Sequence, residues 1–115
     1  MILNNKQMFD SLMVLAQVEE KGMLGYAVMR NRQKIADEVQ AYSAQRDELL
    51  HKYGTDIGKG QYTLTNENAT LFYEELKPFS ELTVDVPVMR VSPEVFYGGN
   101  LTSNQMFILD WMVEE

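Results

Sequence analysis

At 115 residues the chain has the length of one domain, because a single hydrophobic core typically serves about 100–150 residues. Its hydrophobic share of 45% and charged share of 23% are those of an ordinary globular protein, which argues against wholesale disorder. The lack of cysteine excludes disulfides and thiolate metal sites, and no apolar run approaches the roughly 20 residues of a membrane span. The first residues lack the apolar stretch of a signal peptide. We therefore expect one cytoplasmic domain over residues 1–115 with no membrane contact.

The net charge of −7 is unevenly distributed along the chain. Residues 1–57 hold seven Lys/Arg and eight Asp/Glu, a net −1, and residues 58–115 hold three and nine, a net −6. An acidic surface disfavours nucleic-acid phosphates, so we expect no direct nucleic-acid binding. The charge is compatible with simple solubility, the commoner explanation, or with contact to a basic partner protein. The acidic residues that would contact such a partner are Glu74, Glu75, Glu81 and Asp85.

The first half of the chain, residues 1–54, predicts a helical hairpin. Its first helix spans residues 5–20, with Asn4 or Asn5 as the N-terminal cap and an apolar stripe at helical spacing. Gly22 is the predicted stop of this helix, because glycine readily adopts the left-handed conformation that follows helix ends.

The second helix, predicted over residues 23–53 and ended by a left-handed Gly54, dominates the chain. Thirty-one helical residues span about 46 Å, whereas a domain of about 100 residues has a radius of gyration of about 13 Å. The helix must project, fold back at a break or pair with another chain, and we therefore expect a homo-oligomer. Apolar residues recur along it every seven positions, as in a mixed coiled-coil seam. The residues expected in the oligomer interface are Val28, Ile35, Tyr42, Leu49 and Trp111.

Residues 55–115 predict a subdomain of strands and shorter helices. In order, it has a glycine-bearing loop over 55–60, a strand over 61–65, a helix capped by Asn66 and ended by Pro78, and an edge strand over 82–88. A helical turn capped by Ser92 follows, and Thr102 and Gln105 have the spacing of a capping box. The last helix is apolar nearly all round, which predicts that it is buried. The fold class is α+β: a long helical hairpin, a small antiparallel sheet and a buried C-terminal helix.

The residues offer little support for catalysis or for a bound metal. His51 is the only histidine and has no visible orienting partner, so we interpret it as structural. Adjacent carboxylates on a helix point about 100° apart and do not converge on one substrate. We therefore expect no enzyme activity, no metal and no cofactor. The one basic cluster could hold a phosphate or another anion, although such side chains more often pair with nearby acids; it comprises Arg30, Arg32 and Lys34.

Read end to end, the chain resembles a family of small viral proteins encoded by tailed phages and prophages of Gram-positive bacteria. The resemblance rests on residues 5–7, the long charged segment 41–54, the segments 72–76 and 82–88, and the closing segment 109–115. None of these segments is a catalytic motif. The resemblance implies a phage accessory protein that works in the host cell by stoichiometric protein binding, for example as a counter-defence inhibitor of a host enzyme. Two alternatives stay open: a virion structural or assembly protein that self-associates, and a protein that binds or sequesters nucleotides.

Overall fold

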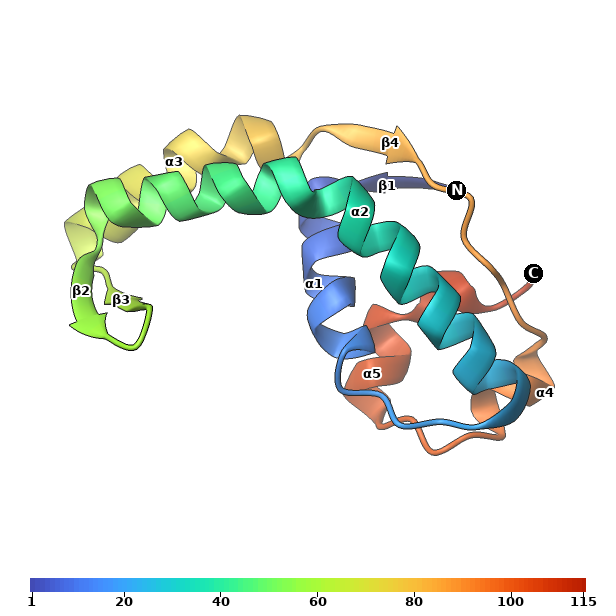
Figure 1. Cartoon of the computed structure of the whole chain (residues 1–115). Helices are drawn as coiled ribbons and strands as arrows, with labels where there is room; N and C mark the ends of the chain where they lie inside the picture. Colours follow the sequence, from blue (N-terminus) through green and yellow to red (C-terminus); the bar gives the residue numbers. More distant parts are fainter.

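One long curved helix, α2, organises the computed structural model, which describes all 115 residues (Figure 1). The elements in chain order are β1 (Ile2–Asn4), α1 (Asn5–Leu15), α2 (Gly22–Tyr53), β2 (Thr55–Gly58), β3 (Gln61–Thr63), α3 (Asn66–Ser80), β4 (Thr83–Asp85), α4 (Pro93–Tyr97), α5 (Ser103–Ile108) and the 3-10 turn η1 (Asp110–Met112). The α+β class, with its long helix, small antiparallel sheets and C-terminal helix, is confirmed. None of these helices is both long and apolar enough to span a membrane.

The length of α2 divides the molecule into a body and an arm. The first half of α2 packs with α1, α4 and the C-terminal segment into the body, and its second half continues outward beside α3 (Figure 1). We call residues 43–80 the arm; the β2–β3 hairpin lies at its far end. The radius of gyration is 16.0 Å and the longest dimension is 45 Å. The sequence allowed the long helix to project, to fold back at a break or to pair with another chain. Within this single chain, the helix projects.

The first helix begins as predicted but ends early. The Asn4 side chain accepts from the Gln7 N–H at 2.7 Å, and the Asn4 N–H donates to Gln7 Oε1 at 2.8 Å, which completes a capping box. The helix ends at Leu15, five residues before the predicted Glu20, because residues 16–21 cross to the start of α2. The prediction that Gly22 stops this helix is wrong. Its φ of +65° instead turns the chain into α2.

Two small antiparallel sheets replace the loop and the longer strand that the sequence predicts. Residues 55–58 form β2 and pair with β3, where we expected a loop. Gly54 is extended, not left-handed, because β2 begins directly after it. Strand β4 keeps only Thr83–Asp85 of the predicted 82–88 and pairs with β1. Pro87, which has no N–H for a ladder, lies outside the pairing.

Helix α3 differs from its prediction at both ends. Thr65, not Asn66, is the N-terminal cap, and its hydroxyl accepts from the Asn68 N–H at 3.2 Å. The helix also runs through Pro78 to Ser80, so the prediction that Pro78 ends it is wrong. Pro78 lies in the last turn and on the exposed side, where the carbonyl that loses its partner can bond to water.

The C-terminal segment is shorter and more irregular than the predicted helix. The Thr102–Gln105 capping box is present, but α5 ends at Ile108 and the 3-10 turn η1 follows. Phe107 is 79% exposed, which differs from the expectation that this helix is buried on all sides. Burial falls instead on Leu109 and Met112, which follow the helix and belong to the core.

One buried polar side chain joins the long helix to the segment that follows β4. Asn31 on α2 is fully buried, and its Nδ2 donates to the Met89 carbonyl at 2.9 Å. The Met89 N–H in turn donates to Asn31 Oδ1 at 2.7 Å. Both backbone groups of Met89 are therefore satisfied by one amide, which holds a segment without regular structure against the middle of the body.

Replacing Asn31 with alanine should destabilise the body, since it leaves both Met89 groups without their partner. We expect the free energy of unfolding to fall by about 2–4 kcal/mol, measured by urea denaturation followed by circular dichroism. Gln33→Ala, at an exposed position on the same helix, is the control and should change stability by less than about 0.5 kcal/mol. An Asn31→Ala protein as stable as this control would contradict the role given to the amide.

Candidate functional site

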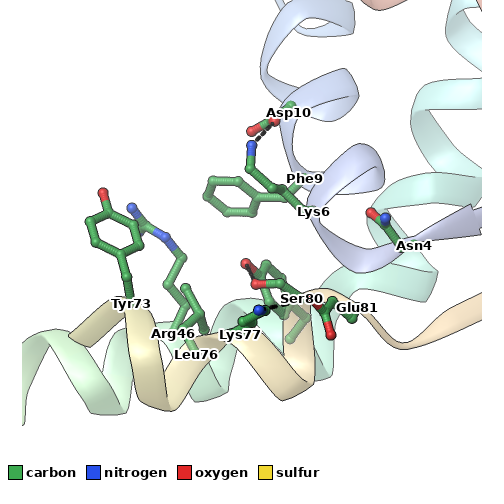
Figure 2. Close-up of a pocket in the computed structure, with 11 residues that line it drawn as sticks. Asn4, Lys6, Phe9, Asp10, Arg46, Tyr73, Leu76, Lys77, Ser80 and Glu81 are labelled. Atoms are coloured by element: carbon green, nitrogen blue, oxygen red, sulfur yellow. Dashed lines mark hydrogen bonds and ion pairs between the residues drawn. The ribbon is translucent and has the colours of Figure 1, made fainter. Parts of the chain in front are cut away.

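One of two concave features of similar volume is a groove where the arm meets the body. It has a volume of about 560 Å³ and lies between α1 on one side and α2 with α3 on the other (Figure 2). A volume of this size is typical of sites that take a small ligand or a few side chains of a partner. The lining side chains are Asn4, Lys6, Phe9 and Asp10 from the α1 side, Tyr42 and Arg46 from α2, and Tyr73, Leu76, Lys77, Ser80 and Glu81 from the α3 side.

The base of the groove is held by aromatic packing and one hydrogen bond. Tyr42 is buried, and its hydroxyl lies 2.9 Å from the Ser80 hydroxyl, which ties the end of α3 to α2. The rings of Phe9 and Tyr42 meet edge to face, with centroids 5.8 Å apart. The arm is therefore fixed to the body at the groove.

Three cations line the groove, and two of them have a carboxylate partner on their own helix. Lys6 Nζ lies 2.6 Å from Asp10 Oδ2, and this hydrogen bond raises the pKa of Lys6 above its ordinary value. Lys77 lies 3.8 Å from Glu81. Arg46 has no carboxylate within 4.0 Å; instead its guanidinium carbon lies 4.9 Å from the centre of the Phe9 ring. Arg46 is thus the one groove cation whose charge is not offset by an acid.

The structure separates the four acidic residues predicted to meet a basic partner. Glu75 accepts from the Tyr53 hydroxyl at 2.5 Å and from Lys52 at 3.2 Å, so it belongs to the contact between α2 and α3. Glu81 has Lys77 beside it, and the Asp85 carboxylate lies 2.7 Å from the amino group of Met1. Only Glu74 has no cation within 4.0 Å. The negative charge open to a basic partner is smaller than the composition implies.

The predicted basic cluster does not converge on one point. Arg30 and Lys34 are one turn apart on α2, and Arg32 points about 200° away from Arg30 because two helical residues separate them. The Arg30 guanidinium lies 5.9 Å from the centre of the Tyr26 ring. Because Arg32 points away from the face that Arg30 and Lys34 share, the three side chains cannot hold one anion together.

The residues predicted for an oligomer interface are used inside the chain. The four heptad residues are buried in the core of this single chain, so they offer almost no surface to a second chain in this conformation: Val28, Ile35, Tyr42 and Leu49. Trp111 is half-buried, and its Nε1–H donates to the Ser11 hydroxyl at 3.0 Å. Self-association stays a prediction, but an interface between two chains would have to use other side chains.

The remaining titratable side chains do not gather into a metal-binding cluster. No three His, Asp or Glu side chains lie together as metal ligands would. His51 Nδ1 lies 2.7 Å from the Asp47 carbonyl, and its ring packs on Tyr62 of the hairpin at 4.8 Å between centroids. These contacts hold the hairpin against the end of α2.

Sequence reasoning missed the groove, although one sign of it was present. Arg46 follows Tyr42 by four residues, so both lie on the same face of α2. A lone arginine on an otherwise apolar face of a helix was the available signal. Its neighbours Phe9 and Tyr73 come from helices far away in the sequence, and no local pattern predicts that they meet.

Replacing Tyr53 with phenylalanine should raise the pKa of Glu75. The Tyr53 hydroxyl, followed by Lys52, holds the pKa of this carboxyl below its ordinary value of 4.5. A depressed pKa means that the contact stabilises the fold above about pH 4.5 and that this stabilisation is lost as the pH falls. Carboxyl-carbon NMR titration should show the Glu75 midpoint moving up in Tyr53→Phe and unchanged in the control Tyr97→Phe. An unmoved midpoint in Tyr53→Phe would contradict this assignment.

Comparison with protein-family models, with curated proteins and with solved structures found no match to this chain. The resemblance to proteins of tailed phages and prophages, seen in segments such as 41–54 and 109–115, therefore stays a hypothesis. The groove and the arm are the features from which a function can be inferred.

Proposed function

We propose that this chain acts by binding another protein stoichiometrically, with the arm and the groove at its base as the contact surface. One observation carries the proposal: α3 exposes large apolar side chains along a helix that packs mainly on one neighbour. Leu71 is 44% exposed, Tyr73 62% and Phe79 38%, and α3 buries only Phe72 and Leu76. Three exposed large apolar side chains on a helix that projects from the body are open to contact with a partner protein.

The shape of the arm supports the same proposal. The arm consists of the second half of α2 and of α3, which lie side by side and extend away from the body (Figure 1). A partner can therefore approach it from the α2 side or from the α3 side. Its own core is thin, because Leu49, Phe72 and Leu76 are the only buried apolar side chains in residues 43–80. A partner that covers the arm would therefore add burial that the chain alone lacks.

The biological setting that we propose is that of an accessory protein of a phage or prophage, with inhibition of a host enzyme as one form that the binding could take. This part rests on the sequence resemblance alone. Self-association in a virion is the alternative in which the partner is a second copy, and nucleotide sequestration is the alternative in which the groove takes a small molecule.

Affinity capture from a lysate of a Gram-positive bacterium, followed by native mass spectrometry, tests the proposal. We expect one protein to be retained in a fixed ratio to the chain. The double change Leu71→Gln and Tyr73→Gln should lower the retained amount at least tenfold, which corresponds to about 1.4 kcal/mol of binding free energy. Both positions are exposed, so circular dichroism should show an intact fold.

The matched control makes the same type of change on the body. Met13→Gln and Met29→Gln replace exposed apolar side chains on α1 and on the first half of α2. They should leave capture unchanged. Equal loss in both variants, or no retained protein, would contradict the proposal. Retention of the chain's own second copy would instead favour self-association.

A further inference from the structure

The most unusual side chain in the groove is Arg46. It is half-buried, and its guanidinium carbon lies 4.9 Å from the Phe9 ring centre and 5.8 Å from the Phe72 ring centre. A guanidinium group has five N–H donors, and none of those of Arg46 forms a hydrogen bond within the chain. Aromatic rings interact with its faces, so the donors at its edge are free for a group outside the chain.

The surroundings of Arg46 combine this free charge with apolar surface. Tyr73 and Arg46 extend from the arm toward Phe9 on α1, and Leu76 lies at the base between them (Figure 2). The partly buried Phe9 and the exposed Tyr73 offer ring surface to a ligand, and the buried Leu76 closes the base of the groove. A ligand that fits must therefore carry an apolar side chain and a hydrogen-bond acceptor close to it.

The charge balance indicates which acceptor. Lys6 and Lys77 are paired with Asp10 and Glu81, which leaves one net positive charge, on Arg46. A phosphate carries nearly two negative charges, more than the single unpaired cation offsets. A carboxylate carries one charge and matches the fork of one guanidinium with two parallel hydrogen bonds.

We propose that the groove recognises a segment of a partner protein in which an Asp or Glu stands next to a large apolar residue. The carboxylate pairs with Arg46, and the apolar side chain packs between Phe9 and Tyr73. This rests on the proposed function and names the chemistry of the partner. The acidic character of the chain as a whole does not oppose it, because the free charge within the groove is positive.

Two short peptides test the proposal without a known partner. N-acetyl-Leu-Phe-Glu-amide and N-acetyl-Leu-Phe-Gln-amide differ only in the charge of one side chain. In ¹H–¹⁵N NMR titrations up to about 10 mM peptide, we expect the Glu peptide to shift the Arg46 Nε signal and the amides that line the groove. The Gln peptide should bind at least fivefold more weakly.

Variants of Arg46 show whether a loss of peptide affinity comes from the lost charge or from a disturbed fold. Arg46→Gln should reduce the affinity for the Glu peptide to that for the Gln peptide, and Arg46→Lys should restore part of the difference because it keeps the charge without the fork. Arg30→Gln, on the body portion of α2, is the control and should bind as the parent does. The dispersion of the amide spectrum reports whether each variant is folded.

Equal affinity for the two peptides, unchanged binding by Arg46→Gln, or no groove shift at about 10 mM would overturn the inference. Inorganic phosphate that displaces the Glu peptide at equal concentration would also overturn it, in favour of an anion site. The two proposals fail separately. If the Leu71 and Tyr73 changes abolish capture of a partner but Arg46→Gln still retains it, only the proposed groove chemistry is wrong. If no partner is captured at all, the proposed protein-binding function is wrong.

Discussion

The length of α2 is the constraint on which the rest of the structure depends. Its 32 residues extend beyond the body, so the first half packs mainly on α1 and α4 and the second half mainly on α3, with the β2–β3 hairpin against its end. This division produces the arm. It also produces the groove, because α1 of the body faces α2 and α3 of the arm where the two parts meet. Asn31 fixes the body side of α2, and the Tyr42–Ser80 contact fixes the arm side.

Much of the fold could be predicted, since its strongest signals are local. The long helix was predicted over 23–53 and is found over Gly22–Tyr53, because a run without proline and an apolar heptad pattern leave few alternatives. The caps at Asn4, Ser92 and Thr102 also follow from short patterns. The pairing of β1 with β4 could not be predicted, because it joins two three-residue strands about eighty residues apart with no local pattern.

The candidate site was much harder to predict than the fold. Composition placed the emphasis on acidic residues, yet Glu75, Glu81 and Asp85 each have a cation nearby within the chain. Charges counted along a sequence are not the charges that a partner meets, because neighbours on adjacent helices neutralise them. The groove depends on Phe9, Arg46 and Tyr73, which lie on three helices, so its charge and shape appear only once those helices are packed.

Native-state hydrogen exchange along α2 tests most directly whether one helix serves two environments of different stability. The amides of the body portion, residues 24–38, should exchange only through global unfolding. Those of the arm portion, residues 43–53, and of α3 should exchange through a smaller opening of lower free energy, because the arm has a thin core. Uniform protection across the whole of α2 and α3 would contradict the account, since body and arm would then form one cooperative unit.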